Sequence, residues 1–70
     1  PRWAFAQHVE AYVARGYALQ ELGRLHAALA SFERAIAADK THGGALAAKG
    51  GILKELGRLD DATSVLRLAM

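Results

Sequence analysis

The hydrophobic residues of this chain recur every three or four positions, and no segment shows the sustained alternation of a strand. A first helix is predicted from about Arg2 to Leu22, because Gly16 is the one residue in that stretch that disfavours a helix. Gly23 then stands where a left-handed C-terminal cap is expected. A second helix is predicted over Leu25–Ala38. Its apolar stripe consists of Leu25, Ala28, Leu29, Phe32, Ala35 and Ile36.

The second half of the chain is expected to form another pair of helices. A polar turn is predicted at residues 39–44, followed by a third helix from about Ala45 to Leu56 that stops at Gly57. A fourth helix is predicted from Leu59 or Asp60 to the end of the chain, with Asp60 and Asp61 in its first turn, where carboxylates favour the positive end of the helix dipole. Because the connections are short, neighbouring helices should lie antiparallel.

The two halves are copies of one unit. The pentapeptide Glu21–Leu25 recurs as Glu55–Leu59, 34 positions later. Further identities fall on the same shift: Ala11 with Ala45, Ala14 with Ala48, Gly16 with Gly50, Leu19 with Leu53, Ala28 with Ala62, and Ala35 with Ala69. Self-similarity at a fixed period of this size is typical of stacked repeats, which bind partners more often than they catalyse reactions.

Two adjacent glycines, Gly50 and Gly51, weaken the predicted third helix. A glycine inside a helix costs about 1 kcal/mol relative to alanine. We therefore expect this helix to be the least stable. We also expect a neighbouring helix to approach closely at Gly50, since its counterpart in the first copy, Gly16, is a glycine as well.

The two copies resemble the tetratricopeptide repeat, a helix–turn–helix unit with the pattern W-x2-L-G-x2-Y, then A-x3-F, then P. The positions that carry the resemblance are Tyr12, Arg15, Gly16, Leu19, Ala28 and Phe32 in the first copy, and Leu46, Lys49, Gly50, Leu53, Ala62 and Leu66 in the second. The sequence departs from the pattern in three ways. Lys40 replaces the closing proline, Arg15 and Lys49 occupy a usually apolar position, and the large aromatic is reduced to Tyr12 and then to Leu46.

The resemblance implies an all-α fold of two tandem antiparallel helix–turn–helix hairpins in a right-handed α-solenoid. We expect one domain over residues 1–70. Residues 9–42 would form the first repeat and residues 43–70 a second, truncated one, while residues 1–8 would be an N-terminal extension or the tail of a preceding repeat. Because the chain starts at Pro1 rather than Met, we expect it to be part of a longer protein.

The resemblance also implies a non-catalytic scaffold or adaptor that binds a peptide or a partner helix on its concave face. The residues at the corresponding positions are Glu10, Val13, Tyr17, Gln20, Glu21, Ala47, Gly51, Lys54 and Glu55. Tyr17 would be the anchor, because aromatic side chains dominate binding energetics. The alternative is that this stripe faces water or an adjacent repeat. Some repeats of this family bind the free C-terminal carboxylate of chaperones through a set of Lys and Asn residues at these positions. This chain has no Asn, so we do not expect that kind of binding.

Two other functions remain open from the sequence. The predicted last helix carries Val65, Leu66, Leu68 and Met70 with nothing after them to cover them, and Trp3 and Phe5 lie at the other end. Such faces could join copies of the chain into a homo-oligomer, since a solenoid hides its terminal apolar faces. Alternatively, the chain would be an accessory domain of a larger enzyme.

The charge distribution limits the classes of partner that we expect for this chain. The net charge is +2, and nine basic residues are offset by seven acidic ones spread along the chain, so we expect no nucleic-acid partner. Two pairs of basic residues would lie one repeat apart, Arg15 with Lys49 and Arg24 with Arg58. Each pair would either bind phosphate or an acidic peptide or remain solvated.

No apolar run approaches the roughly 18–20 residues of a membrane span. Together with the lack of a signal segment and of Cys, this predicts a cytoplasmic location.

No catalytic, cofactor or metal site is predicted. Three separated histidines, His8, His26 and His42, do not form a metal site without convergent carboxylates or thiolates. Ser31 and Ser64 lack a nucleophile elbow. Adjacent helical residues such as Asp60 and Asp61 point about 100° apart, so they do not share a site. We therefore expect that the chain is not an enzyme.

Overall fold

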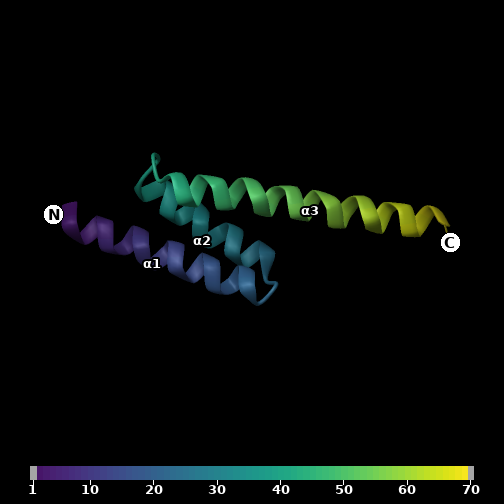
Figure 1. The fold of residues 1–70 in the computed structure, drawn as a ribbon, viewed down its shortest axis with the longest axis horizontal. Helices are drawn as coiled ribbons and strands as arrows, with labels where there is room; N and C mark the ends of the chain where they lie inside the picture. Colours follow the sequence, from purple (N-terminus) through teal and green to yellow (C-terminus); the bar gives the residue numbers. More distant parts are fainter. Residues whose placement is uncertain (1, 70) are drawn as a thin grey trace.

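The computed structural model describes the backbone of residues 2–69 and the side chains of residues 8–61. Within this range the chain forms three helices, α1 (Arg2–Glu21), α2 (Leu25–Ala38) and α3 (Gly43–Ala69), and no strand (Figure 1). The all-α class and the first two predicted helices are confirmed. The expectations for the apolar side chains at the two chain ends lie outside the described side chains. They concern Trp3, Phe5, Val65, Leu66, Leu68 and Met70.

The connection between α1 and α2 is a glycine-dependent helix cap. Gly23 has φ +77°, and it is the one described residue with a positive φ. The Arg24 N–H donates to the Leu19 carbonyl (N···O 2.9 Å), and the Gly23 N–H donates to the Gln20 carbonyl (3.0 Å). These two bonds satisfy carbonyls that would otherwise lack partners at the helix end. The predicted left-handed cap is therefore confirmed, and it turns the chain back so that α2 runs antiparallel to α1 (Figure 1).

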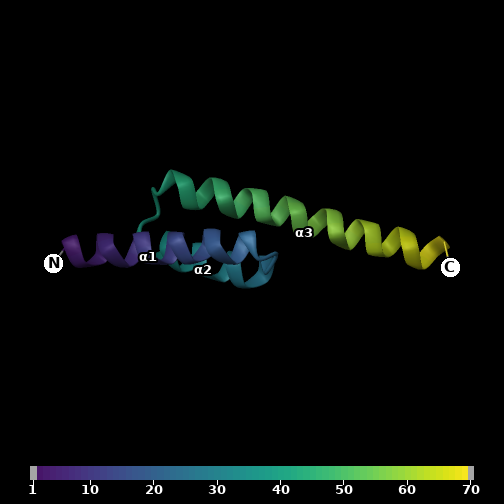
Figure 2. The ribbon, with the colours of Figure 1, turned by 60° about the horizontal axis from the view of Figure 1, so that its bottom comes forward.

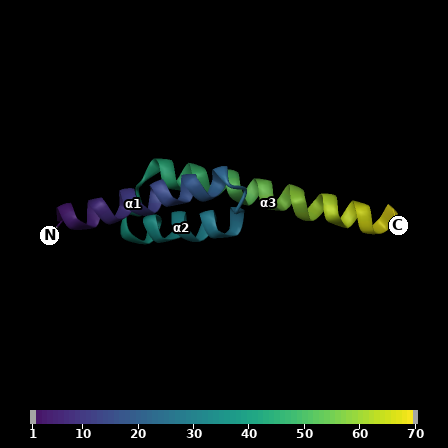
Figure 3. The same ribbon diagram turned by 90° about the horizontal axis from the view of Figure 1, so that it is seen from below.

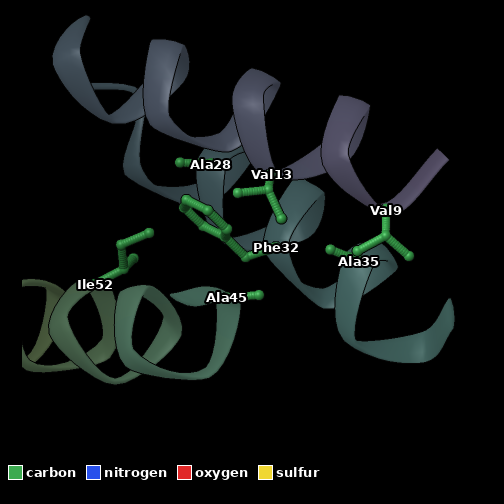
Figure 4. Packing of buried hydrophobic residues seen from close by; sticks show 7 residues of the cluster. All are labelled: Val9, Val13, Ala28, Phe32, Ala35, Ala45 and Ile52. Carbon is green, nitrogen blue, oxygen red and sulfur yellow. The ribbon is translucent and has the colours of Figure 1, made fainter. Parts of the chain in front are cut away.

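The core lies where the three helices meet, and Phe32 of α2 is at its centre (Figure 4). Its ring is fully buried, with Val13 of α1 on one side and Ala45 and Ile52 of α3 on the other. The ring fits against α1 because position 16 has no side chain. A Cβ atom built at Gly16 would lie 2.7 Å from the ring atoms Cε1 and Cζ. Gly16, the small residue of the repeat pattern, thus leaves the space that the Phe32 ring occupies.

The helix α3 packs against α2 and runs in the same direction as α1 (Figures 1 and 2). Its buried residues are Ala45 and Ile52, and Ala48 and Leu56 are partly buried beside them. The helix α2 has 14 residues and the helix α3 has 27, so they are about 21 Å and about 40 Å long. Consequently α2 covers only the first part of α3, and the rest projects beyond the hairpin (Figure 3).

The predicted break at Gly57 is wrong. One helix continues from Gly43 to Ala69, and residues 59–69 do not form a separate fourth helix. Asp60 and Asp61 therefore lie inside α3 instead of in a first turn. The pentapeptide that forms a turn at Glu21–Leu25 is helical at Glu55–Leu59. The free N–H and C=O groups of a helix end need capping bonds or packing, and a continuous helix satisfies them without either.

The expected close approach at Gly50 is also wrong for this chain conformation. Among the described residues, no side chain or other helix comes within 4 Å of a Cβ atom built at Gly50 or at Gly51. The close approach occurs at Gly16 instead, where α2 provides the partner. Gly50 and Gly51 therefore lower the helix propensity of α3 with no packing in return.

These differences predict unequal outcomes for the same substitution at two helical glycines. We expect Gly16→Val to lower the free energy of unfolding by about 1–3 kcal/mol, because the new side chain overlaps the buried Phe32 ring. We expect the matched control Gly51→Val to change it by no more than about 0.5 kcal/mol in either direction. Urea denaturation followed by circular dichroism measures both. Equal effects at the two positions would contradict the packing described for Gly16.

Candidate functional site

Tyr17 is the most prominent apolar side chain on the face shared by α1 and α3. Its ring meets the Phe32 ring edge-on, with centroids 5.1 Å apart and an interplanar angle of 75°. Although this contact fixes the ring, Tyr17 remains 46% exposed. Its hydroxyl lies 3.5 Å from a Cβ atom built at Gly44, so α1 and the first turn of α3 are close neighbours here. A rigid, half-exposed aromatic ring is a suitable anchor for a partner, because little side-chain entropy is lost on binding.

His42 joins α1 to α3 at one end of this face. Its Nδ1 atom accepts a hydrogen bond from the Ala45 N–H (3.0 Å), and its Nε2 atom lies 3.2 Å from Glu10 Oε1. Because Nδ1 is an acceptor, the proton of the neutral ring is on Nε2 and is donated to the Glu10 carboxylate. The first contact caps the start of α3, and the second ties that start to α1. His42 therefore fixes the relative placement of the two helices that form the face.

The predicted site residues other than Tyr17 and Val13 are small or polar. The remaining predicted residues at the surface are all exposed: Glu10, Gln20 and Glu21 on α1, and Ala47, Gly51, Lys54 and Glu55 on α3. Val13 is the exception, since it is only 6% exposed and belongs to the core beside Phe32. The expectation that Val13 contacts a partner is therefore corrected: its position on α1 turns toward α2 and α3 and supports the face from below. The face is shallow, because α3 contributes no large apolar residue to it.

The charged residues on this face are mainly acidic. Three carboxylates, those of Glu10, Glu21 and Glu55, accompany one ammonium group, that of Lys54. The Glu10 side chain is 72% exposed even though it pairs with His42. Exposed charges of this kind affect the rate and specificity of association more than its affinity.

A pocket of about 190 Å³ lies on another face of the hairpin, between α1 and α2. It is lined by Tyr12, Arg15, Leu19, Ala27, Ala30, Ser31 and Arg34. The Arg34 guanidinium lies 5.8 Å from the centroid of the Tyr12 ring, and the Ser31 hydroxyl donates to the Tyr12 carbonyl (2.8 Å). These polar groups therefore already have partners within the hairpin. The volume is below the about 300–1,000 Å³ of small-molecule sites.

The basic residues expected to pair from one repeat to the next are found in different surroundings. Arg15 lines the pocket between α1 and α2, whereas Lys49 extends toward α2, with its Nζ atom 3.9 Å from Glu33 Oε1. Arg24 is the N-cap residue of α2, whereas Arg58 lies inside α3. The divergence follows from the length of α3. This helix continues through Gly57, whereas α1 ends before the corresponding glycine, Gly23. No pair of cations converges on one site among these four side chains.

The described residues also bear on other kinds of site. Among them, no group of three His, Asp or Glu side chains could hold a metal ion. Ser31 is 5% exposed and its hydroxyl is used in the hairpin bond to Tyr12, so its role there is structural. Over the same part of the chain, no helix combines the length and the apolar character needed to cross a membrane.

Comparison with known proteins agrees with this geometry. The tetratricopeptide repeat family matches residues 9–42, which contain most of α1, all of α2 and the turn that leads into α3. Residues 9–42 are a tetratricopeptide repeat. No curated protein and no solved structure matches the chain. Tetratricopeptide repeats generally act as protein–protein interaction modules and are typically non-catalytic.

Two residues of the repeat's closing turn have roles that the sequence analysis missed. Both His42 and Asp39 were expected only as part of the polar turn at residues 39–44. The structure shows that Asp39 is the C-cap of α2 and that His42 caps the start of α3. No signal in the sequence indicated this role of His42, because His is not among the residues preferred at the N-cap of a helix. The contact of His42 with Glu10 joins residues 32 positions apart and had no local signal.

We expect His42→Ala to lower the free energy of unfolding by about 1 kcal/mol, because it removes the cap of α3 and the bond to Glu10. His42→Asn should recover most of this loss, since a short amide can still cap the helix. The exposed His26 provides the matched control, and His26→Ala should change the stability by less than about 0.5 kcal/mol. Thermal and urea unfolding of the three variants measure these effects. An unchanged stability for His42→Ala would show that the cap does not form in solution.

Asp39 gives a prediction for the acid range. The Thr41 hydroxyl donates to Asp39 Oδ1 (2.8 Å), as does the Thr41 N–H (3.0 Å), and these bonds hold the pKa of Asp39 below its ordinary value. Because the folded pKa is the lower one, this stabilisation is present above the ordinary carboxyl pKa and is lost as the pH falls through the folded pKa. Thr41→Val should raise the pKa of Asp39 in an NMR titration of its Cγ. An unchanged pKa would contradict the hydroxyl bond.

Proposed function

We propose that this chain is a non-catalytic interaction module that binds a partner on the face shared by α1 and α3. We define this partner-binding face by its exposed residues: Glu10, Tyr17, Gln20, Glu21, Ala47, Gly51, Lys54 and Glu55. The observation that carries the proposal is the fixed and half-exposed ring of Tyr17, which packs edge-on against the core and still offers its other surface to a ligand. The match of residues 9–42 to an interaction repeat supports the same function.

The shape of the face favours a helical partner over a bulky globular one. Ala47 and Gly51 are exposed and small, so a partner helix could approach the backbone of α3 closely beside Tyr17. An amphipathic helix places apolar residues at three- and four-residue spacing, which fits a shallow apolar strip of this kind. The surrounding carboxylates favour basic residues on the partner's flanks. We therefore propose an amphipathic helix with a basic border as the ligand.

A binding measurement on a selected peptide tests this proposal. A helical peptide is first selected from a displayed library for binding to the full chain, and its dissociation constant is then measured by calorimetry. We expect Tyr17→Ala to weaken binding by about 30-fold or more, because central aromatic residues contribute about 2 kcal/mol or more at interfaces. Tyr17→Phe, which keeps the ring, should weaken it by much less. Circular dichroism of both variants checks that the helices remain folded.

Two further variants locate the bound peptide. Lys54→Glu changes the charge on the partner-binding face without touching the core, so we expect it to alter the affinity for a peptide with basic flanks. Arg15→Ala lies at the pocket between α1 and α2 and should have no effect. Chemical-shift changes on peptide addition should cluster around Tyr17 and Gly51. A cluster around Tyr12, Arg15 and Arg34 instead would overturn the proposed face.

A further inference from the structure

Each helix of the α1–α2 hairpin supplies one set of residues to the contact between them, and α3 holds the counterparts of both sets. In the hairpin, α1 presents Tyr12, Gly16 and Leu19 to α2, and the buried residues that α2 inserts are Ala28, Phe32 and Ala35. All three inserted residues are 0% exposed. The positions 34 residues later hold Leu46, Gly50 and Leu53 as the receiving set, and Ala62, Leu66 and Ala69 as the inserted set. The chain therefore contains both halves of a second interface of the same kind.

The receiving half of that second interface is open in the structure. Leu46 is 45% exposed and Leu53 is 48% exposed, and a Cβ atom built at Gly50 would meet none of the described atoms within 4 Å. The counterpart Gly16, by contrast, is buried beneath the Phe32 ring. We call the open set, Leu46, Gly50 and Leu53, the α3 receiving face. It is distinct from the partner-binding face and from the residues of α3 that pack on α2.

The inserted half cannot reach the receiving face of its own chain. Residues 59–69 continue α3 without a break at Gly57, so they project away from the hairpin (Figures 1 and 3). A segment of a straight helix cannot fold onto an earlier segment of the same helix. The same residues of a second copy have no such restriction, and the sequence already matches them to this face position by position.

The substitutions between the two interfaces are compatible with such a contact. Tyr12 and Arg34 form a cation–π pair in the hairpin, and Leu46 and Leu68 occupy the corresponding positions. The Ser31 hydroxyl bonds to the Tyr12 carbonyl, and Val65 occupies the position that corresponds to Ser31. Polar contacts of the hairpin are thus replaced by apolar residues. At these positions a contact between chains would depend on apolar burial, which drives association.

We propose that the α3 receiving face binds residues 59–69 of a second copy of this chain, in the way that α1 binds α2. Gly50 of one copy would lie against Leu66 of the other, as Gly16 lies against Phe32. Gly50 and Leu66 are 16 positions apart, which turns a straight helix by about 160°. Each copy therefore presents the two halves on nearly opposite sides of α3. A contact of this type joins copies head to tail and continues from copy to copy instead of closing as a symmetric dimer.

Light scattering of the purified chain over a concentration series gives the first test. The chain has a mass of 7.5 kDa, and we expect the average mass to rise steadily with concentration through species larger than two copies. Gly50→Val should hold the chain at the monomer mass, because its side chain fills the space that receives Leu66. Gly51→Val is the matched control with the same change in helix propensity and should associate like the unaltered chain. Equal association of the two variants would overturn the proposal.

Complementation between two variants gives a sharper test. Gly50→Val removes the receiving half and Leu66→Lys removes the inserted half, so each variant alone should remain a monomer. Their equimolar mixture retains one intact contact and should form a heterodimer of twice the monomer mass. No heterodimer in the mixture, or a monomeric unaltered chain at all concentrations, would overturn the proposal. The binding of a peptide at Tyr17 uses other residues, so its outcome is independent of this test.

Discussion

The packing of Phe32 against Gly16 is the interaction on which the rest of the structure depends. The ring is fully buried at the meeting point of all three helices, and it can lie there only because α1 has no side chain at position 16. This contact fixes α2 on α1, and Ala45 and Ile52 then place α3 on the other side of the same ring. It also supports Tyr17, whose edge rests on Phe32 while its outer surface stays accessible. Phe32 therefore contributes both to the stability of the fold and to the placement of Tyr17 on the candidate binding face.

The two copies of the repeated pentapeptide show how packing decides the local structure. At Glu21–Leu25 the chain turns through a left-handed glycine, and the turn is followed by α2, whose apolar stripe is buried against α1. At Glu55–Leu59 the same residues continue a helix. Phe32 in the first copy corresponds to Leu66 in the second, and Tyr12 to Leu46, so the second hairpin would bury smaller side chains. A turn at Gly57 would give less burial in return for breaking a continuous helix.

Periodicity and repeat symmetry were sufficient to predict α1, α2, the cap at Gly23 and the position of Phe32 in the core. These features depend on local spacing and on contacts between neighbouring elements. The break at Gly57 and the close approach at Gly50 were predicted wrongly, because repeat symmetry assumes that equal sequences have equal surroundings. Val13 was assigned to the surface by analogy, although its position on α1 turns toward α2 and α3. The contact of His42 with Glu10 joins distant parts of the chain, so no local pattern could indicate it.

The most direct test of this account is a distance between spin labels on either side of Gly57. Labels at Ala47→Cys and Arg67→Cys need no other cysteine replaced, because the chain has none. The labelled protein is diluted with unlabelled protein, so that only distances within one chain are measured by double electron–electron resonance. A continuous α3 predicts a backbone separation of about 30 Å. A separation of about 10 Å, the spacing of packed helices, would show that the second copy closes as the first does and would contradict the account.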